Sequence, residues 1–208
     1  MKIFCIGMQK TGTCSLHKFF LDCNLKSTHN PLWWYESDMK YFNQYDCFTD
    51  GFERYTNVVT FPNLMFLEEN FNGCKFILQT RSLRPWLISR LRHGDEVYRN
   101  GINTNCFDET VFLTWVNDRN YWHSIVYNHF KNKENLLVFD IESDNKENKL
   151  CSFLNIQSSN TKFETHNTKL NYKNNDNEIL ISNKIDTFLR DYIVEEDHNT
   201  KSIARLKN

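Results

Sequence analysis

Short apolar runs alternate along the chain with longer segments whose apolar residues recur every three or four positions. Residues 2–7 form an apolar run that ends in glycine, and residues 15–25 then place apolar side chains on one helical face. This order predicts a strand, a loop and a helix. Residues 57–60, 75–80 and 136–140 are continuous runs of β-forming residues. Such runs are typical of strands covered on both faces in a parallel sheet.

The segments between and after these runs predict helices. Pro85 stands where the first turn of a helix ending near Arg92 would begin, a position at which proline is well tolerated. The longest helical pattern covers about residues 110–130, a short one covers 150–154, and a final amphipathic one lies near 179–193. A helix therefore precedes or follows each predicted strand.

Polar segments and the order of the elements indicate the fold class. Residues 144–149 are predicted to form a connector, and the end of the chain a frayed, mildly basic tail. Strands that alternate with helices, with a glycine loop after the first strand, predict an α/β fold with a P-loop-type parallel sheet flanked by helices. The length fits a single domain over residues 1–208, with its core within about 1–167 and a C-terminal helix and tail over 176–208.

Charge and cysteine content limit the classes of function. The 25 basic and 26 acidic residues give a net charge of −1, so no global field favours nucleic acid or an anionic membrane. The 7 cysteines include no C-x-x-C pair, which argues against a zinc site or a disulfide framework. No apolar stretch reaches the length of a membrane span or of a signal-peptide core. We therefore expect a soluble, cytoplasmic protein with neither nucleic-acid nor membrane partners.

The loop after the first predicted strand carries the strongest chemical signal. Residues 7–15 have the Gly-x4-Gly spacing of a phosphate-cradling loop, in which glycines let backbone N–H groups close on an anion at a helix N-terminus. A nucleotide triphosphatase has lysine directly after the second glycine, whereas this chain has Thr13 there and Lys10 inside the loop. The pattern therefore predicts an oxyanion site unlike that of an ordinary ATPase or kinase. The alternative is a glycine-rich turn between strand and helix.

Residues 9–16, Gln-Lys-Thr-Gly-Thr-Cys-Ser-Leu, resemble the 5′-phosphosulfate loop of the sulfotransferase family. That loop is approximately Pro-Lys-(Ser/Thr)-Gly-Thr-(Thr/Ser)-(Ser/Trp)-Leu. The resemblance implies that Lys10 contacts the oxygen bridging phosphate and sulfate in 3′-phosphoadenosine 5′-phosphosulfate (PAPS). It also implies that the 5′-phosphate is held by Thr11, Gly12, Thr13, Cys14 and Ser15. Cys14 stands where the family has a hydroxyl residue, and Gln9 where it has proline or arginine.

A second motif supports the same resemblance. Residues 75–89 combine a predicted strand, Arg81 at its exit, a proline-started helix, and Ser89 eight residues after the arginine. The resemblance implies that Arg81 and Ser89 bind the 3′-phosphate of PAPS, since a guanidinium offers a charge-assisted fork and a hydroxyl adds a neutral donor. Where the family continues Arg-Asp-Pro, this chain has Arg-Ser-Leu-Arg-Pro. The resemblance covers about residues 2–167.

The implied reaction transfers a sulfuryl group from PAPS to an acceptor hydroxyl or amine and releases 3′-phosphoadenosine 5′-phosphate (PAP). Positioning and charge stabilisation supply most of the catalysis in such in-line transfers, so we expect Lys10 and backbone donors to act without a metal. The acceptor needs a general base, for which His29, Glu36 and Asp50 are candidates and Asp50 is preferred over His29. Each of these two residues has a competing interpretation as an ordinary loop or turn residue.

Other features leave the acceptor open. The cluster Trp33-Trp34-Tyr35 is either an aromatic wall for the acceptor or part of the core, and the core is the favoured interpretation. We expect the acceptor to be a small molecule or a glycan. Two alternative functions remain, a P-loop kinase acting on a nucleotide or small molecule, and a non-catalytic PAP-binding interaction module. The displaced lysine disfavours the first, and the presence of Lys10, Arg81 and Ser89 disfavours the second.

Overall fold

The chain divides into two compact units in the computed structural model. The first unit comprises Met1–Thr80 and His129–Thr168, and the second comprises Arg81–Asn128 and Lys169–Asn208. The backbone is described for residues 1–29, 33, 39–51, 53–55, 58–98, 109–156, 162–164, 175–196 and 202–206. Within those ranges, the side chains of residues 53–55, 58–60, 92–98, 175–178, 192–196 and 202–206 are not described.

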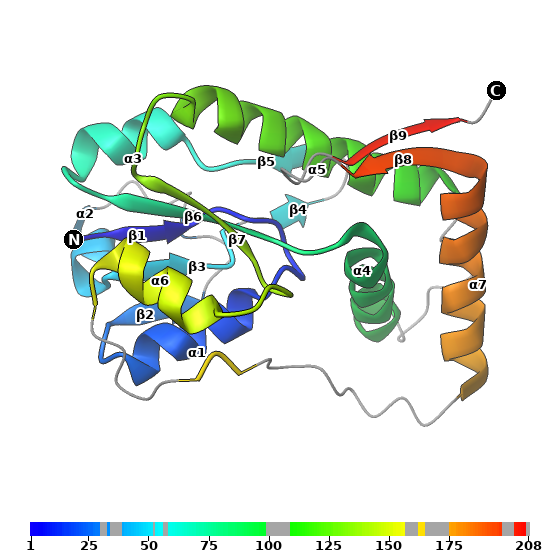
Figure 1. Ribbon diagram of the computed structural model, residues 1–208, viewed down its shortest axis with the longest axis horizontal. Helices are drawn as coiled ribbons and strands as arrows, with labels where there is room; N and C mark the ends of the chain where they lie inside the picture. The colour runs from blue at the N-terminus through cyan, green and yellow to red at the C-terminus, as the bar shows by residue number, and fades with distance from the viewer. Residues whose placement is uncertain are drawn as a thin grey trace. The chain divides into compact units, whose positions relative to one another are not determined.

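A five-stranded parallel sheet forms the first unit (Figure 1). Its strands are β1 (Ile3–Cys5), β2 (Ser27–His29), β3 (Cys47–Thr49), β6 (Lys75–Thr80) and β7 (Leu136–Asp140). They lie in the order β2-β3-β1-β6-β7, and each neighbouring pair is parallel. Helices flank this sheet, so the predicted α/β class with a P-loop-type parallel sheet is confirmed.

One face of the sheet packs on α1 (Thr13–Asp22) and α6 (Lys146–Leu154). Since consecutive strand residues point to opposite faces, the side chains of Ile3, Cys5 and Ile77 fall on this side. They join buried residues of the two helices, among them Leu16, Phe19, Leu150 and Leu154. The loop that follows β1 is thereby anchored on both sides, by the strand before it and the buried helix after it.

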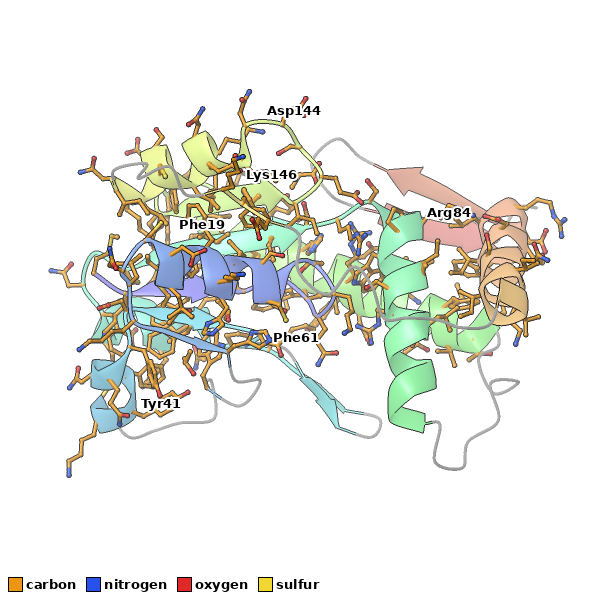
Figure 2. The ribbon with its side chains drawn as sticks, turned by 90° about the horizontal axis from the view of Figure 1, so that it is seen from below. Phe19, Tyr41, Phe61, Arg84, Asp144 and Lys146 are labelled. Carbon is orange, nitrogen blue, oxygen red and sulfur yellow. The ribbon has the colours of Figure 1, made fainter. Side chains whose placement is uncertain are left out.

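The opposite face of the sheet is aromatic. Phe4 stacks on Phe48 with ring centroids 5.1 Å apart and lies 5.6 Å from Phe76. Rings from α2 (Met39–Gln44), from the end of α3 (Leu64–Asn70) and from the end of α5 (Glu109–Phe130) cover these strand residues. Figure 2 marks the two faces with Phe19 from α1 and Tyr41 from α2.

Trp33 belongs to this aromatic face. Its ring centroid is 5.5 Å from that of Phe4, and the residue is 0% exposed. The interpretation of Trp33 as core is therefore confirmed, whereas Trp34 and Tyr35 lie outside the described residues.

Two expectations about strands are wrong. Residues 57–60 were expected in the parallel sheet, yet β5 (Val58–Thr60) pairs antiparallel with β4 (Glu53–Tyr55) in a separate two-stranded sheet. A run of β-forming residues does not specify its partner, and a strand close in sequence costs less loop-closure entropy. The end of the chain is also not a frayed tail, because β8 (Tyr192–Glu196) and β9 (Ser202–Leu206) form an antiparallel pair.

The expected connector over residues 144–149 is mostly helix, since α6 begins at Lys146. Glu147 in its first turn accepts a hydrogen bond from the backbone N–H of Phe163 at 2.6 Å. The charged residues of this turn therefore lie on the outer side of a helix whose inner side, Leu150, Cys151 and Leu154, is buried. Polarity alone did not distinguish an amphipathic helix start from a loop.

The second unit is built on helices. Pro85 lies in the first turn of α4 (Leu83–Tyr98), as predicted, although the helix runs beyond the expected end near Arg92. Arg84 Nε and Nη2 donate to the two carboxylate oxygens of Asp186 at 2.8 and 2.9 Å and connect α4 to α7 (Asn175–Asp191) (Figure 2). None of the described helices is long and apolar enough to cross a membrane.

Candidate functional site

The loop after β1 is held close to β6 by two hydrogen bonds. The backbone N–H of Gly7 donates to Gln79 Oε1 at 2.9 Å, and Gln79 Nε2 donates back to the Gly7 carbonyl at 3.2 Å. A Cβ on Gly7 would lie 2.2 Å from the Gln79 backbone oxygen, so only glycine fits here. Gln79 is 0% exposed and its amide is satisfied by this exchange. The first glycine of the motif therefore fixes where the loop starts.

The loop turns through two left-handed residues before α1 begins. Lys10 has φ 66° and Gly12 has φ 90°, and Gly12 is the N-cap of α1 without any side-chain cap. A Cβ on Gly12 would lie 2.9 Å from Ile141 Cγ2, so the second glycine is required by space as well as by backbone conformation. Thr11 Oγ1 donates to the Met8 carbonyl and closes the turn. The amide end of α1 is thus presented at the carboxyl edge of the sheet.

Lys10 is the less expected of the two left-handed residues. A non-glycine residue in this region carries a steric cost of about 1–2 kcal/mol. Asp50, which directly follows β3, is also left-handed at φ 65°. Strained backbone of this kind is concentrated at functional sites, where the surrounding structure enforces it. Both of these sequence-predicted candidates therefore occupy conformations that the fold must impose.

His29, at the end of β2, connects the loop to the end of β3. Its Nε2 lies 3.2 Å from Cys14 Sγ and 3.7 Å from Asp50 Oδ2. Its Nδ1 lies 3.0 Å from Thr49 Oγ1, and Thr49 Oγ1 donates to the Thr28 carbonyl at 2.9 Å. Parallel strands end at one edge of a sheet, which is why residues so far apart in sequence meet here.

Thr49 fixes the tautomer of His29. The Thr49 hydroxyl has one proton, and it is committed to the Thr28 carbonyl. The contact with His29 Nδ1 then requires that Nδ1 carry a proton and donate it to Thr49 Oγ1. In neutral His29 the lone pair is consequently on Nε2, the nitrogen that faces Cys14 and Asp50.

The charges of this cluster alter one another's pKa. The hydrogen bond from His29, aided by the charges of His29 and Lys10, lowers the pKa of the Cys14 thiol despite burial and the opposing charge of Asp50. Burial acts to lower the pKa of His29, but Cys14 and Asp50 together outweigh it and raise that pKa. Burial raises the pKa of Asp50, although His29, a hydrogen bond from Thr13, and Lys10 oppose this.

The structure brings together most of the predicted site. The sequence-predicted loop residues and both preferred base candidates lie in the first unit, at the carboxyl ends of β1, β2 and β3. Arg81 and Ser89 belong to the second unit, where Arg81 directly follows β6 and Ser89 lies within α4. Glu36 lies outside the described residues.

Thr49 and Gln79 are site residues that the sequence analysis missed. Both are 0% exposed polar residues inside strands. A buried polar side chain must find a hydrogen-bond partner, so the glutamine within the apolar run over residues 75–80 was the available signal.

Comparison with protein-family models and with curated proteins finds no match for this chain. Among the described residues, no group of three or more His, Cys, Asp or Glu side chains is arranged to hold a metal ion.

Proposed function

We propose that this protein is a sulfotransferase that transfers a sulfuryl group from PAPS to an acceptor hydroxyl or amine and releases PAP. The observation that carries the proposal is the loop between β1 and α1. It combines a lysine inside the loop with the amide end of a helix whose N-cap is Gly12, at the carboxyl edge of a parallel sheet. Amides, hydroxyls and one ammonium group are a donor set suited to a phosphate or sulfate ester.

Residues 10–15 would hold the 5′-phosphosulfate of PAPS, which supplies the activated sulfuryl group. The role of Lys10 is to neutralise charge that develops on the leaving phosphate oxygen, because a fixed ammonium stabilises that charge without reorganisation. The amides at the start of α1 do the same for the remaining phosphate oxygens. The roles of Arg81 and Ser89 as ligands of the 3′-phosphate come from the sequence motif alone.

Asp50 is the proposed general base, with His29 as its partner. The acceptor proton passes to a carboxylate oxygen of Asp50. Protonated His29, whose Nε2 lies 3.7 Å from Oδ2, favours the ionised carboxylate that accepts this proton. The raised pKa of Asp50, caused by burial, makes this carboxylate a stronger base than an exposed one. The acceptor itself is proposed as a small molecule or a glycan.

Thermal stability in the presence of nucleotides tests the cofactor. A ligand at about 100 times its dissociation constant stabilises a fold by about 2.7 kcal/mol. We expect PAP to raise the unfolding temperature while AMP and Mg-ATP do not. Arg81→Ala should lose this response, and its backbone carbonyl, which accepts from Arg119 Nη2 at 2.8 Å, is unaffected by the change.

Arg84→Ala is the matched control. This neighbouring arginine is engaged with Asp186, so its loss should leave the PAP response intact. A response to Mg-ATP with none to PAP would reject the sulfotransferase and favour the kinase. A response to PAP without release of PAP from PAPS, across small-molecule and glycan acceptors, would favour the non-catalytic module.

A further inference from the structure

Cys14 differs from the other described cysteines in its environment. Cys5, Cys47, Cys74 and Cys151 are buried, and burial raises the pKa of the Cys5, Cys47 and Cys74 thiols. The two half-buried thiols lie at opposite ends of α1, Cys14 in the first turn and Cys23 at the C-cap. The amide end of a helix favours a thiolate, and Cys14 is the one of the two that lies at that end of α1.

A chain of hydrogen bonds prepares Cys14 to react. Thr49 holds His29 with its proton on Nδ1, which leaves the Nε2 lone pair directed at Cys14 Sγ, 3.2 Å away. A nucleophile in contact with a base, and a base oriented by a third group, is the arrangement that activates serine and cysteine nucleophiles in enzymes.

The charged groups that alter the pKa of the Cys14 thiol come from β2, from the loop and from the residue after β3. His29 on β2 and Lys10 in the loop favour the thiolate, and Asp50 after β3 opposes it. His17 on the same helix acts indirectly, because its ring lies 5.5 Å from that of His29 and its Nδ1 is engaged with Ser27 Oγ at 2.8 Å. His29 Nε2 lies 3.2 Å from the sulfur, and its hydrogen bond is the largest of the effects that lower the pKa of the Cys14 thiol.

We propose that Cys14 is a nucleophilic thiol and the site of covalent modification by peroxide. The thiolate sulfur attacks one oxygen of hydrogen peroxide, the O–O bond breaks, and the sulfur is oxidised to a sulfenic acid. The departing hydroxide takes the proton from the His29 imidazolium and leaves as water, so peroxide is reduced as the thiol is oxidised. The added oxygen then occupies the first turn of α1. On the proposed function, in which residues 10–15 hold PAP, this added oxygen also excludes PAP from the loop.

Alkylation of the full chain by iodoacetamide, followed by mass spectrometry of its peptides, measures the reactivity without any nucleotide. At about pH 6.5, Cys14 should react at least about fivefold faster than Cys23, the half-buried thiol of the same helix. His29→Gln should remove that advantage. His17→Gln, which changes the neighbouring imidazole whose Nδ1 is engaged with Ser27 Oγ, should retain it. Equal alkylation rates at Cys14 and Cys23 in the unaltered chain would overturn the proposal. It would also be overturned if Cys14 were still alkylated faster than Cys23 in His29→Gln.

Dilute hydrogen peroxide followed by dimedone, a trap for sulfenic acids, should label Cys14 and not Cys23 or the buried thiols. An absence of label on Cys14 would reject the peroxide chemistry. The outcomes for the two proposals are separable. If Cys14 is alkylated fast and labelled by dimedone while PAP does not stabilise the protein, the reactive-thiol proposal is supported and the PAPS proposal is rejected. If Cys14 is alkylated slowly while PAP stabilises the protein, the reactive-thiol proposal is rejected and the PAPS proposal stands.

Discussion

At the scale of single residues, the geometry of the site is determined by residues whose hydrogen-bond partners or available space permit only one arrangement. The Thr49 hydroxyl donates its one proton to the Thr28 carbonyl, and this determines which nitrogen of His29 is available to Cys14 and Asp50. Gly7 is equally constrained, because any side chain would collide with the Gln79 backbone. The geometry of the loop thus depends on the strand residues Thr49 and Gln79 as well as on the loop's own side chains.

Asp50→Asn tests the proposed base. Asparagine tolerates the left-handed backbone at this position and fills the same volume, so the fold and PAP binding should persist. Turnover of PAPS should fall by about 10²–10⁴-fold, since the proton acceptor is gone. Because burial raises the pKa of Asp50, the proposed activity of the unaltered protein should decline as pH falls through that raised value, at a higher pH than for an exposed carboxylate.

The steady-state rate of PAP release as a function of pH measures both effects. Asp46→Asn is the control, since Asp46 precedes β3 and accepts a hydrogen bond from the Lys26 N–H at 2.9 Å, away from the loop. Full activity in Asp50→Asn would eliminate this residue as the base and leave His29 and Glu36 as the candidates.

At the scale of elements, apolar runs predicted some strands and missed others. Four consecutive non-polar residues in 3–6 and the longer run in 75–80 marked β1 and β6, which are buried on both faces. β2 reads Ser-Thr-His, and β3 ends in Thr49, so neither shows an apolar run of useful length. Their polar residues are the ones that build the site. The motif placed Lys10 and Cys14 in the loop, but the hydrogen bonds among His29, Thr49 and Cys14 depend on strand pairing that no local pattern contains.

Glu68 of α3 connects this helix to the end of α5 and to the segment before β7, at the end of the sheet opposite the loop. It accepts hydrogen bonds from Lys133 Nζ at 2.5 Å and Asn135 Nδ2 at 3.0 Å, and it contacts His129 Nε2 at 2.6 Å. Burial acts to raise the pKa of Glu68, but these partners outweigh it and hold the pKa below the ordinary value of 4.5. A carboxylate with a depressed folded-state pKa stabilises the fold above its unfolded-state pKa and loses that effect as pH falls through the folded-state value.

We therefore expect Glu68→Gln to reduce stability at neutral pH by about 0.5–1 kcal/mol and to have a smaller effect in acid. Urea unfolding at about pH 7 and at pH values below about 4 gives the two free energies. Glu69→Gln removes the adjacent exposed carboxyl and should behave as the unaltered chain. If Glu68→Gln destabilises equally at both pH values, its carboxylate charge is not what the network uses.

At the scale of the whole molecule, the two faces of the parallel sheet have different compositions. The face under α1 and α6 combines aliphatic residues and cysteines with phenylalanines such as Phe19 and Phe139, and it positions the loop. The other face is a continuous set of aromatic rings centred on Phe4, whose ring lies within 5.1 to 6.3 Å of five others. These rings supply a large buried apolar area over strands that are only three residues long in β1 and β3.

Phe4→Ala tests whether this aromatic face holds the first unit together. Phe4 is 0% exposed, and truncating a buried phenylalanine costs about 3–5 kcal/mol through lost burial and the cavity that remains. Since domains of this kind are stable by only about 5–15 kcal/mol, the urea midpoint should fall by a large fraction. Met65→Ala removes a large apolar side chain that is 62% exposed, and it should change stability by less than about 0.5 kcal/mol. A loss below about 1 kcal/mol in Phe4→Ala would mean that the sheet relies on the α1 and α6 face instead, because Phe4 would then lack the packing that its ring contacts imply.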